Sequence, residues 1–176
     1  MTERSDEPVI GAQRSEHPMT DTHPNVARVV AAAEDLGLTI STRRFPEGTK
    51  TAADAAAAIG VAVGQIVKSL IFAVDGNVVL AYVSGANMLD ERKLAAAAGG
   101  TKAGRVDADT VRVATGFPIG GVPPFGHVTH LRVFIDPDLL QYDEVWAAAG
   151  TWNDVFPIAP DDLVRASAGT VTDLKK

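Results

Sequence analysis

A loop rich in glycine and proline, residues 116–126, is the segment of this chain best suited to binding a ligand. It reads Gly-Phe-Pro-Ile-Gly-Gly-Val-Pro-Pro-Phe-Gly and holds four glycines and three prolines. Gly120 and Gly121 leave their backbone amides open to a ligand, whereas Pro123 and Pro124 fix φ and stiffen the loop. We therefore expect a preorganised binding loop. The alternative is a tight connection between two strands.

Lys68 is the charged residue with the most unusual surroundings. It lies in the apolar run of residues 66–74, where the alternation of a strand places it on the same face as Leu70 and Phe72. An amine on such a face is costly unless it reaches solvent, an anion or a partner. Two interpretations stay open, a binding cation and a lysine that extends along apolar surface to solvent. Ser69 falls on the opposite face, so the two residues do not form a nucleophile and base pair.

The other chemical motifs are weak. His127 and His130 have an H-x-x-H spacing, but no cysteine is present and no further ligand completes a metal set, so surface or hydrogen-bonded histidines are expected. Neither a P-loop nor a dinucleotide-binding glycine motif occurs. Asp136 follows a short apolar run and precedes Pro137, which favours a role in capping the next turn.

Composition sets the frame for these residues. The chain has 176 residues, of which 46% are hydrophobic, so residues 22–176 are expected to form one domain, preceded by a flexible polar tail at residues 1–21. A net charge of −6 argues against a protein that binds many phosphates of a nucleic acid. Any contact with nucleic acid is therefore expected to be local. No cysteine, no membrane-spanning segment and no signal peptide occur, which predicts a cytoplasmic protein with no membrane partner.

Helices and strands alternate irregularly along the chain. The patterns predict helices at residues 25–36, 51–60, 90–98 and 107–113 and from residue 160, capped by Thr51, Asp90 and Asp107. They predict strands at residues 38–45, 66–74, 78–83, 132–135, 144–148 and 155–158. Asp75-Gly76 is a strong hairpin turn. The fold class is therefore mixed α/β (α+β), with a mostly antiparallel mixed sheet surrounded by helices.

Four segments together resemble the YbaK / prolyl-tRNA-synthetase-associated editing domain family. They are Ile-Val-Lys-Ser-Leu at 66–70, Ser-Gly-Ala-Asn at 84–87, Ala-Thr-Gly-Phe at 114–117 and Gly-Gly-Val-Pro-Pro at 120–124. The resemblance spans about residues 26–174. It implies a mixed α/β fold and hydrolysis of the ester of mischarged aminoacyl-tRNA, typically a small wrong amino acid on tRNA for proline. The family's lysine corresponds to Lys68, and its G-x-x-x-P motif to Gly120 through Pro124.

The resemblance also implies roles for individual residues. Lys68, Gly120 and Gly121 would be catalytic, because fixed donors lower the barrier where the ester carbonyl gains negative charge. The nucleophile would be a positioned water, a ribose hydroxyl or the thiol of a cysteine substrate, with neither cofactor nor metal. The implied substrate-binding residues are Phe45, Phe117, Val122, Pro124, Asp136 and Ala148.

The resemblance thus predicts a free-standing trans-editing deacylase, since 176 residues leave no room for the catalytic and anticodon-binding domains of a synthetase. Its partners would be the acceptor end of tRNA and an aminoacyl-tRNA synthetase. Ala148 stands where some cysteine-specific relatives carry serine, which casts doubt on cysteine as the edited amino acid and leaves alanine or another small residue open. The alternative function is a non-catalytic binding module or regulator that recognises an amino acid, a nucleotide or a tRNA end in the same pocket.

Overall fold

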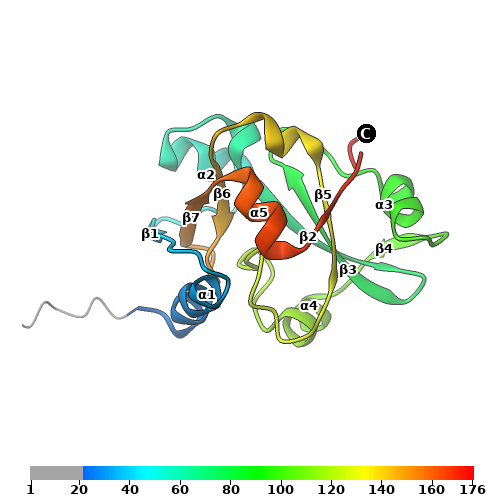
Figure 1. The fold of residues 1–176 in the computed structure, drawn as a ribbon, viewed down its shortest axis with the longest axis horizontal. Helices are drawn as coiled ribbons and strands as arrows, with labels where there is room; N and C mark the ends of the chain where they lie inside the picture. The colour runs from blue at the N-terminus through cyan, green and yellow to red at the C-terminus, as the bar shows by residue number, and fades with distance from the viewer. Residues whose placement is uncertain (1–21) are drawn as a thin grey trace, which may run out of the picture.

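The computed structural model describes residues 22–176 (Figure 1). The tail expected at residues 1–21 lies outside the described residues. A long hairpin of β2 (Val67–Val74) and β3 (Asn77–Ser84) runs through the middle of the fold. Its turn is the predicted Asp75-Gly76 pair, and both residues have positive φ, 49° and 86°. This is the conformation that a two-residue hairpin turn requires.

The hairpin forms the centre of a five-stranded sheet within residues 22–176. β4 (Ala103–Arg105) pairs with β2 in antiparallel fashion, while β5 (Arg132–Ile135) lies parallel to β3 and β8 (Thr170–Val171) parallel to β5. The strand order is β4-β2-β3-β5-β8. The predicted mixed α/β class is confirmed.

A second, antiparallel sheet of β1 (Arg43–Arg44), β7 (Asp154–Ile158) and β6 (Val145–Ala148) stands beside the first. In the described residues a bridge between Ile66 and Trp146 links β6 to the start of β2. The sequence patterns predicted a single sheet. The strands form two sheets because β6 meets β2 only at the Ile66–Trp146 bridge. Since β4 pairs with β2 only at residues 72–74, residues 68–71 have no strand partner on that edge in the described part of the chain.

Helices cover both sheets. They are α1 (Pro24–Asp35), α2 (Ala52–Ile59), α3 (Glu91–Ala97), α4 (Ala108–Thr115) and α5 (Pro160–Ser167), with 3-10 turns η1 (Val63–Gln65) and η2 (Pro137–Gln141). In Figure 1, α2 and the smaller sheet lie at one end and α3 with β4 at the other. The caps predicted at Thr51, Asp90 and Asp107 are confirmed, because each side chain accepts hydrogen bonds from backbone amides of the first turn.

The strand predicted at residues 38–45 is wrong over most of its length, since only β1 is extended and paired. Leu38 and Ile40 pack against the main core from irregular backbone. Their hydrophobicity therefore reflects burial rather than sheet pairing. β2 is covered on both faces as expected: Ile71 packs in the main core, whereas Phe72 packs in a second core with Leu94 and Phe134.

Candidate functional site

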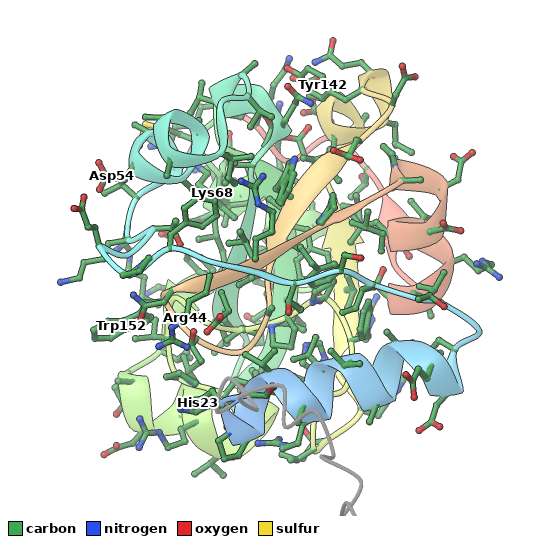
Figure 2. The ribbon with its side chains drawn as sticks, turned by 90° about the vertical axis from the view of Figure 1, so that its left-hand side faces the viewer. His23, Arg44, Asp54, Lys68, Tyr142 and Trp152 are labelled. Carbon is green, nitrogen blue, oxygen red and sulfur yellow. The ribbon has the colours of Figure 1, made fainter. Side chains whose placement is uncertain are left out.

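Lys68 lies on the open edge of β2, and this gap between the sheets is flanked by two cavities. One has a volume of about 430 Å³ and the other about 750 Å³. Residues 68–70 and Ile119 line both. Figure 2 shows Lys68 below α2 on the face that also carries Trp152. Lys68, which was singled out from the sequence alone, therefore lies where the two cavities adjoin.

The ammonium group of Lys68 is held by Asn87, whose backbone oxygen accepts a hydrogen bond from Nζ. Asn87 is itself fixed, because its Nδ2 donates to Asp136 Oδ2 and to Asp138 Oδ2, each at 2.8 Å. Burial lowers the pKa of Lys68 below its ordinary value, and the negative charge of Asp136 partly offsets this. The amine is therefore a positioned group whose charged form is favoured by Asp136.

Asp136 is fully buried at the end of β5 and organises this region. Its carboxylate accepts hydrogen bonds from the amides of Ser84 (3.1 Å) and Asp138 (2.9 Å) in addition to Asn87. The capping role predicted for Asp136 is thereby confirmed. Asn87 and Ser84 were not predicted to have a role of their own, although both belong to the Ser-Gly-Ala-Asn segment that contributed to the family resemblance.

The smaller cavity, which we call the loop cavity, brings Lys68 together with Gly120 and Val122 of the glycine-proline loop and Ala148 of β6. Thr51, Ala52 and Ala55 of the α2 segment close its other side. Four of the predicted site residues thus meet here, from three segments that are distant in the chain. A carbonyl group held here would lie between the lysine and the loop.

The remaining five predicted site residues do not line the loop cavity. Phe117 is only 1% exposed and belongs to the main core, where the Arg28 guanidinium lies 4.3 Å from its ring centre. Phe45 packs near Trp146 in a small separate core. Pro124 and Gly121 are buried in the loop, and Asp136 lies in the network that holds Asn87. Their positions suit support of the cavity rather than contact with an occupant.

Trp152 and the turn between β6 and β7 hold the loop in place. The Trp152 Nε1 donates to the Ile119 oxygen at 2.6 Å, and a Cβ added at Gly120 would lie 3.1 Å from the indole ring. Gly120 also has a φ of 82°, which favours glycine. The Gly121 amide donates to the Pro118 oxygen at 2.9 Å, so it is engaged within the loop. Of the two glycines, Gly120 is the one at the cavity.

A second contact behind the loop depends on residues that sequence reasoning missed. Asn25, in the first turn of α1, donates through Nδ2 to the Gly150 oxygen at 3.0 Å. Gly150 in turn lies against Gly121. The backbones of the loop and the β6–β7 turn therefore approach closely, with α1 packed behind them. Because 125 residues separate Asn25 from Gly150, no local pattern in the sequence indicates this contact.

Replacing Gly121 with alanine is expected to destabilise the loop. The new Cβ would lie 3.0 Å from the carbonyl carbon and oxygen of Gly150 and from Thr151 Cα, and backbone atoms cannot rotate away as a side chain does. Overpacking of this kind costs roughly 1–3 kcal/mol. For a domain of this size we expect Tm to fall by about 2–12 °C. Gly104→Ala is the control in a thermal melt, since its Cβ would meet nothing within 4 Å. Equal melting of both variants would contradict the role of the close approach.

The two histidines of the H-x-x-H pair do not converge on a metal. The His127 Nε2 is hydrogen bonded to the Pro123 oxygen at 2.7 Å, and burial lowers the His127 pKa. His130 is exposed. The prediction of hydrogen-bonded or surface histidines is confirmed. Within residues 22–176 no group of three potential metal ligands is found, and no helix there is long and apolar enough to cross a membrane.

The chain is similar to known editing domains along most of its length. Residues 46–166 match the family model of the aminoacyl-tRNA editing domain. A solved structure described as a candidate trans-editing enzyme for prolyl-tRNA synthetase is 43% identical with a TM-score of 0.83, and the match covers 88% of this chain and 99% of that one. The resemblance proposed from the sequence is therefore confirmed.

Two curated relatives are named as deacylases. The multifunctional Ser/Thr-tRNA deacylase ProXp-y of Escherichia coli K12 is 29% identical over 66% of this chain and 73% of its own. The candidate Cys-tRNA(Pro)/Cys-tRNA(Cys) deacylase EbsC of Enterococcus faecalis is 26% identical over 74% and 80%. Since the family model covers more than half of the chain and the fold agrees, this protein belongs to the aminoacyl-tRNA editing domain family.

Proposed function

We propose that this protein is a deacylase that acts in trans on mischarged tRNA for proline and removes a small wrong amino acid such as cysteine or alanine. The observation that carries the proposal is the loop cavity, where Lys68, Gly120 and Ala148 meet at the open edge of β2. Family membership and the names of the relatives support the same reaction. A cytoplasmic location and contact with a prolyl-tRNA synthetase are parts of this proposal, because charging and editing act on the same tRNA.

The reaction is hydrolysis of the ester between the amino acid and the terminal ribose. A water oxygen attacks the carbonyl carbon, and the carbonyl oxygen becomes negatively charged in the tetrahedral intermediate. The Lys68 ammonium and the Gly120 amide are proposed to stabilise that oxygen. The bond from carbon to the ribose oxygen then breaks. One proton of the water passes to the ribose oxygen, which becomes a hydroxyl group. The other proton goes to solvent, and the amino acid leaves as a carboxylate.

A small side chain is proposed for the edited amino acid from the walls of the loop cavity. Ala52, Ala55 and Ala148 present methyl groups to this space. Methyl walls give a small apolar side chain such as that of alanine a matching surface. The hydroxyl-bearing residues Thr51, Ser69 and Thr151 line the same cavity, so its walls do not separate alanine or cysteine from serine or threonine, and the comparison of the four aminoacyl-tRNAs decides between them.

The direct test is release of amino acid from a panel of charged tRNAs. We expect the protein to hydrolyse alanyl- or cysteinyl-tRNA for proline much faster than correctly charged prolyl-tRNA, with seryl- and threonyl-tRNA included for comparison. Absence of turnover on every member would contradict the proposal. Tight binding of the same tRNAs without release would instead support a non-catalytic recognition module.

The pH dependence of the reaction should report the charge of Lys68. Because burial lowers the pKa of Lys68 from its ordinary 10.5, the cation should lose its proton at a lower pH than a free lysine, and kcat/KM should fall as pH rises through that lowered value. Asp136→Asn removes the charge that favours the cation and should move this fall to still lower pH. The profile is measured after subtracting spontaneous ester hydrolysis. A rate that rises over the same range would show that the neutral amine is the active form.

A further inference from the structure

The larger cavity is lined by a single residue of the glycine-proline loop, Ile119, and the proposed chemistry does not use it. Its volume is about 750 Å³. Of the nine site residues predicted from sequence, only Lys68 lines it. The other walls come from β2, from the start of α3 and from the end of β4. We call it the arginine cavity after Arg92 and Arg105, which line it.

The arginine cavity gathers positive charge in a chain that is acidic overall. Arg92, Arg105, Lys68 and Lys176 line it in a protein whose net charge is −6. Two acids, Asp90 and Glu91, also line it, but the Asp90 carboxylate already caps α3 by accepting from the Arg92 and Lys93 amides. The acids therefore offset the cations only in part.

The two arginines are available to a ligand. Both are exposed, and across residues 22–176 the ion pairs formed by cationic side chains involve Arg44, Lys93, Arg165 and Lys175. A guanidinium with no carboxylate partner presents several donors in one plane, which suits the oxygens of a phosphate.

Exposed apolar side chains stand beside these cations. Met88 is 66% exposed and Ile119 51% exposed, and both line the arginine cavity. Sites for single-stranded nucleic acid combine positive charge for the phosphates with aromatic side chains on which the bases stack. Here Met88 and Ile119 offer aliphatic rather than aromatic surface beside the cations. Ile119 also lines the loop cavity, so the two cavities adjoin at Ile119 and Lys68.

We infer that the arginine cavity binds the unpaired 3′ end of the aminoacyl-tRNA. Arg92 and Arg105 contact its phosphates, while Met88 and Ile119 pack against its bases. The ester then reaches Lys68 from this side, and the amino acid enters the loop cavity. This inference rests on the proposed function. It also accounts for an acidic protein that acts on RNA, because contact is confined to a few nucleotides.

The test compares two substrates with the Arg92→Ala/Arg105→Ala double variant. On mischarged tRNA we expect kcat/KM to fall by about tenfold or more, mainly through KM. The slope of log(kcat/KM) against log[salt] should become shallower by about 0.7 for each phosphate that the variant no longer neutralises. On the aminoacyl ester of adenosine, which carries no phosphate, the rate should be unchanged. Arg165→Ala, an exposed arginine on α5 that lines neither cavity, is the matched control.

Equal rates of wild type and double variant on tRNA would overturn the inference, as would an equal fall in rate on both substrates. Failure of the proposed function is recognised separately, as absence of hydrolysis by the wild type on either substrate. In that case the inference is tested by the affinity for an RNA oligonucleotide ending in CCA, measured by fluorescence anisotropy. The wild type and Arg165→Ala should bind it, and the double variant should bind at least about tenfold more weakly. Equal binding would reject the arginine cavity as the site.

Discussion

Replacing Lys68 with alanine is expected to lower kcat/KM for mischarged tRNA by at least about a hundredfold, the usual loss when one group that stabilises a developing oxyanion is removed. That loss corresponds to about 2.7 kcal/mol of transition-state stabilisation. Stability should change little, because Lys68 is half-buried and its removal deletes a desolvated charge rather than a core side chain. A single-turnover deacylation assay and a thermal melt of the same preparation measure the two effects.

Two further variants separate the roles of charge and shape. Lys68→Met keeps the length of the side chain without its charge, and we expect it to be as inactive as Lys68→Ala. Lys102→Ala removes an exposed lysine that lines neither cavity and should retain full activity. A folded Lys68→Ala protein with undiminished turnover would rule out Lys68 as a catalytic residue.

Asp136→Ala is expected to damage both stability and activity. The buried carboxylate accepts hydrogen bonds from the amides of Ser84 and Asp138 and from the Asn87 side chain. Each buried donor left without a partner costs about 1–3 kcal/mol. We expect a loss on the order of 3 kcal/mol in the free energy of unfolding and a Tm lower by about 6–12 °C. Activity should fall as well, because Asn87, which holds the Lys68 ammonium group, would lose one of the two carboxylates that fix it.

Asp136→Asn tests whether the carboxylate acts through position or through charge. The amide keeps the shape and one acceptor oxygen, so stability should recover in part, while the alkaline fall in activity described above should remain shifted. Asp109→Ala, which removes an exposed acid in the first turn of α4, is the control. Unchanged melting of Asp136→Ala would show that the buried hydrogen bonds contribute little.

Features that depend on neighbouring residues were predictable from the sequence. The Asp75-Gly76 turn and the caps at Thr51, Asp90 and Asp107 each follow from a side chain or a φ value acting within a few residues. The strand expected at residues 38–45 failed because alternating hydrophobicity reports burial and not a pairing partner. The division into two sheets depends on β6 meeting β2 at a single bridge between residues 80 positions apart, which no local pattern encodes.

Of the candidate site, the residues at the loop cavity could be predicted from the sequence, whereas the residues that hold them in place could not. Lys68 and the Gly120 loop were found because a lysine in an apolar strand and a run of glycine and proline are both unusual. Phe117 was expected at the pocket, but it lies in the core, since an aromatic beside a glycine does not reveal which surface its ring meets. The contact between Asn87 and Asp136 joins residues 49 positions apart, and each looks ordinary in its own segment.

The open edge of β2 also limits how this fold can be strengthened. Within the described part of the chain, residues 68–71 leave one row of peptide groups without a strand partner, and such an edge is a place where another chain can add. Extending β4 to pair with this row would protect the edge and add hydrogen bonds. It would also fill the gap through which Lys68 reaches both cavities. Stability and access to the ester therefore compete for the same four residues, so selection for a more stable variant at this edge should yield less active proteins.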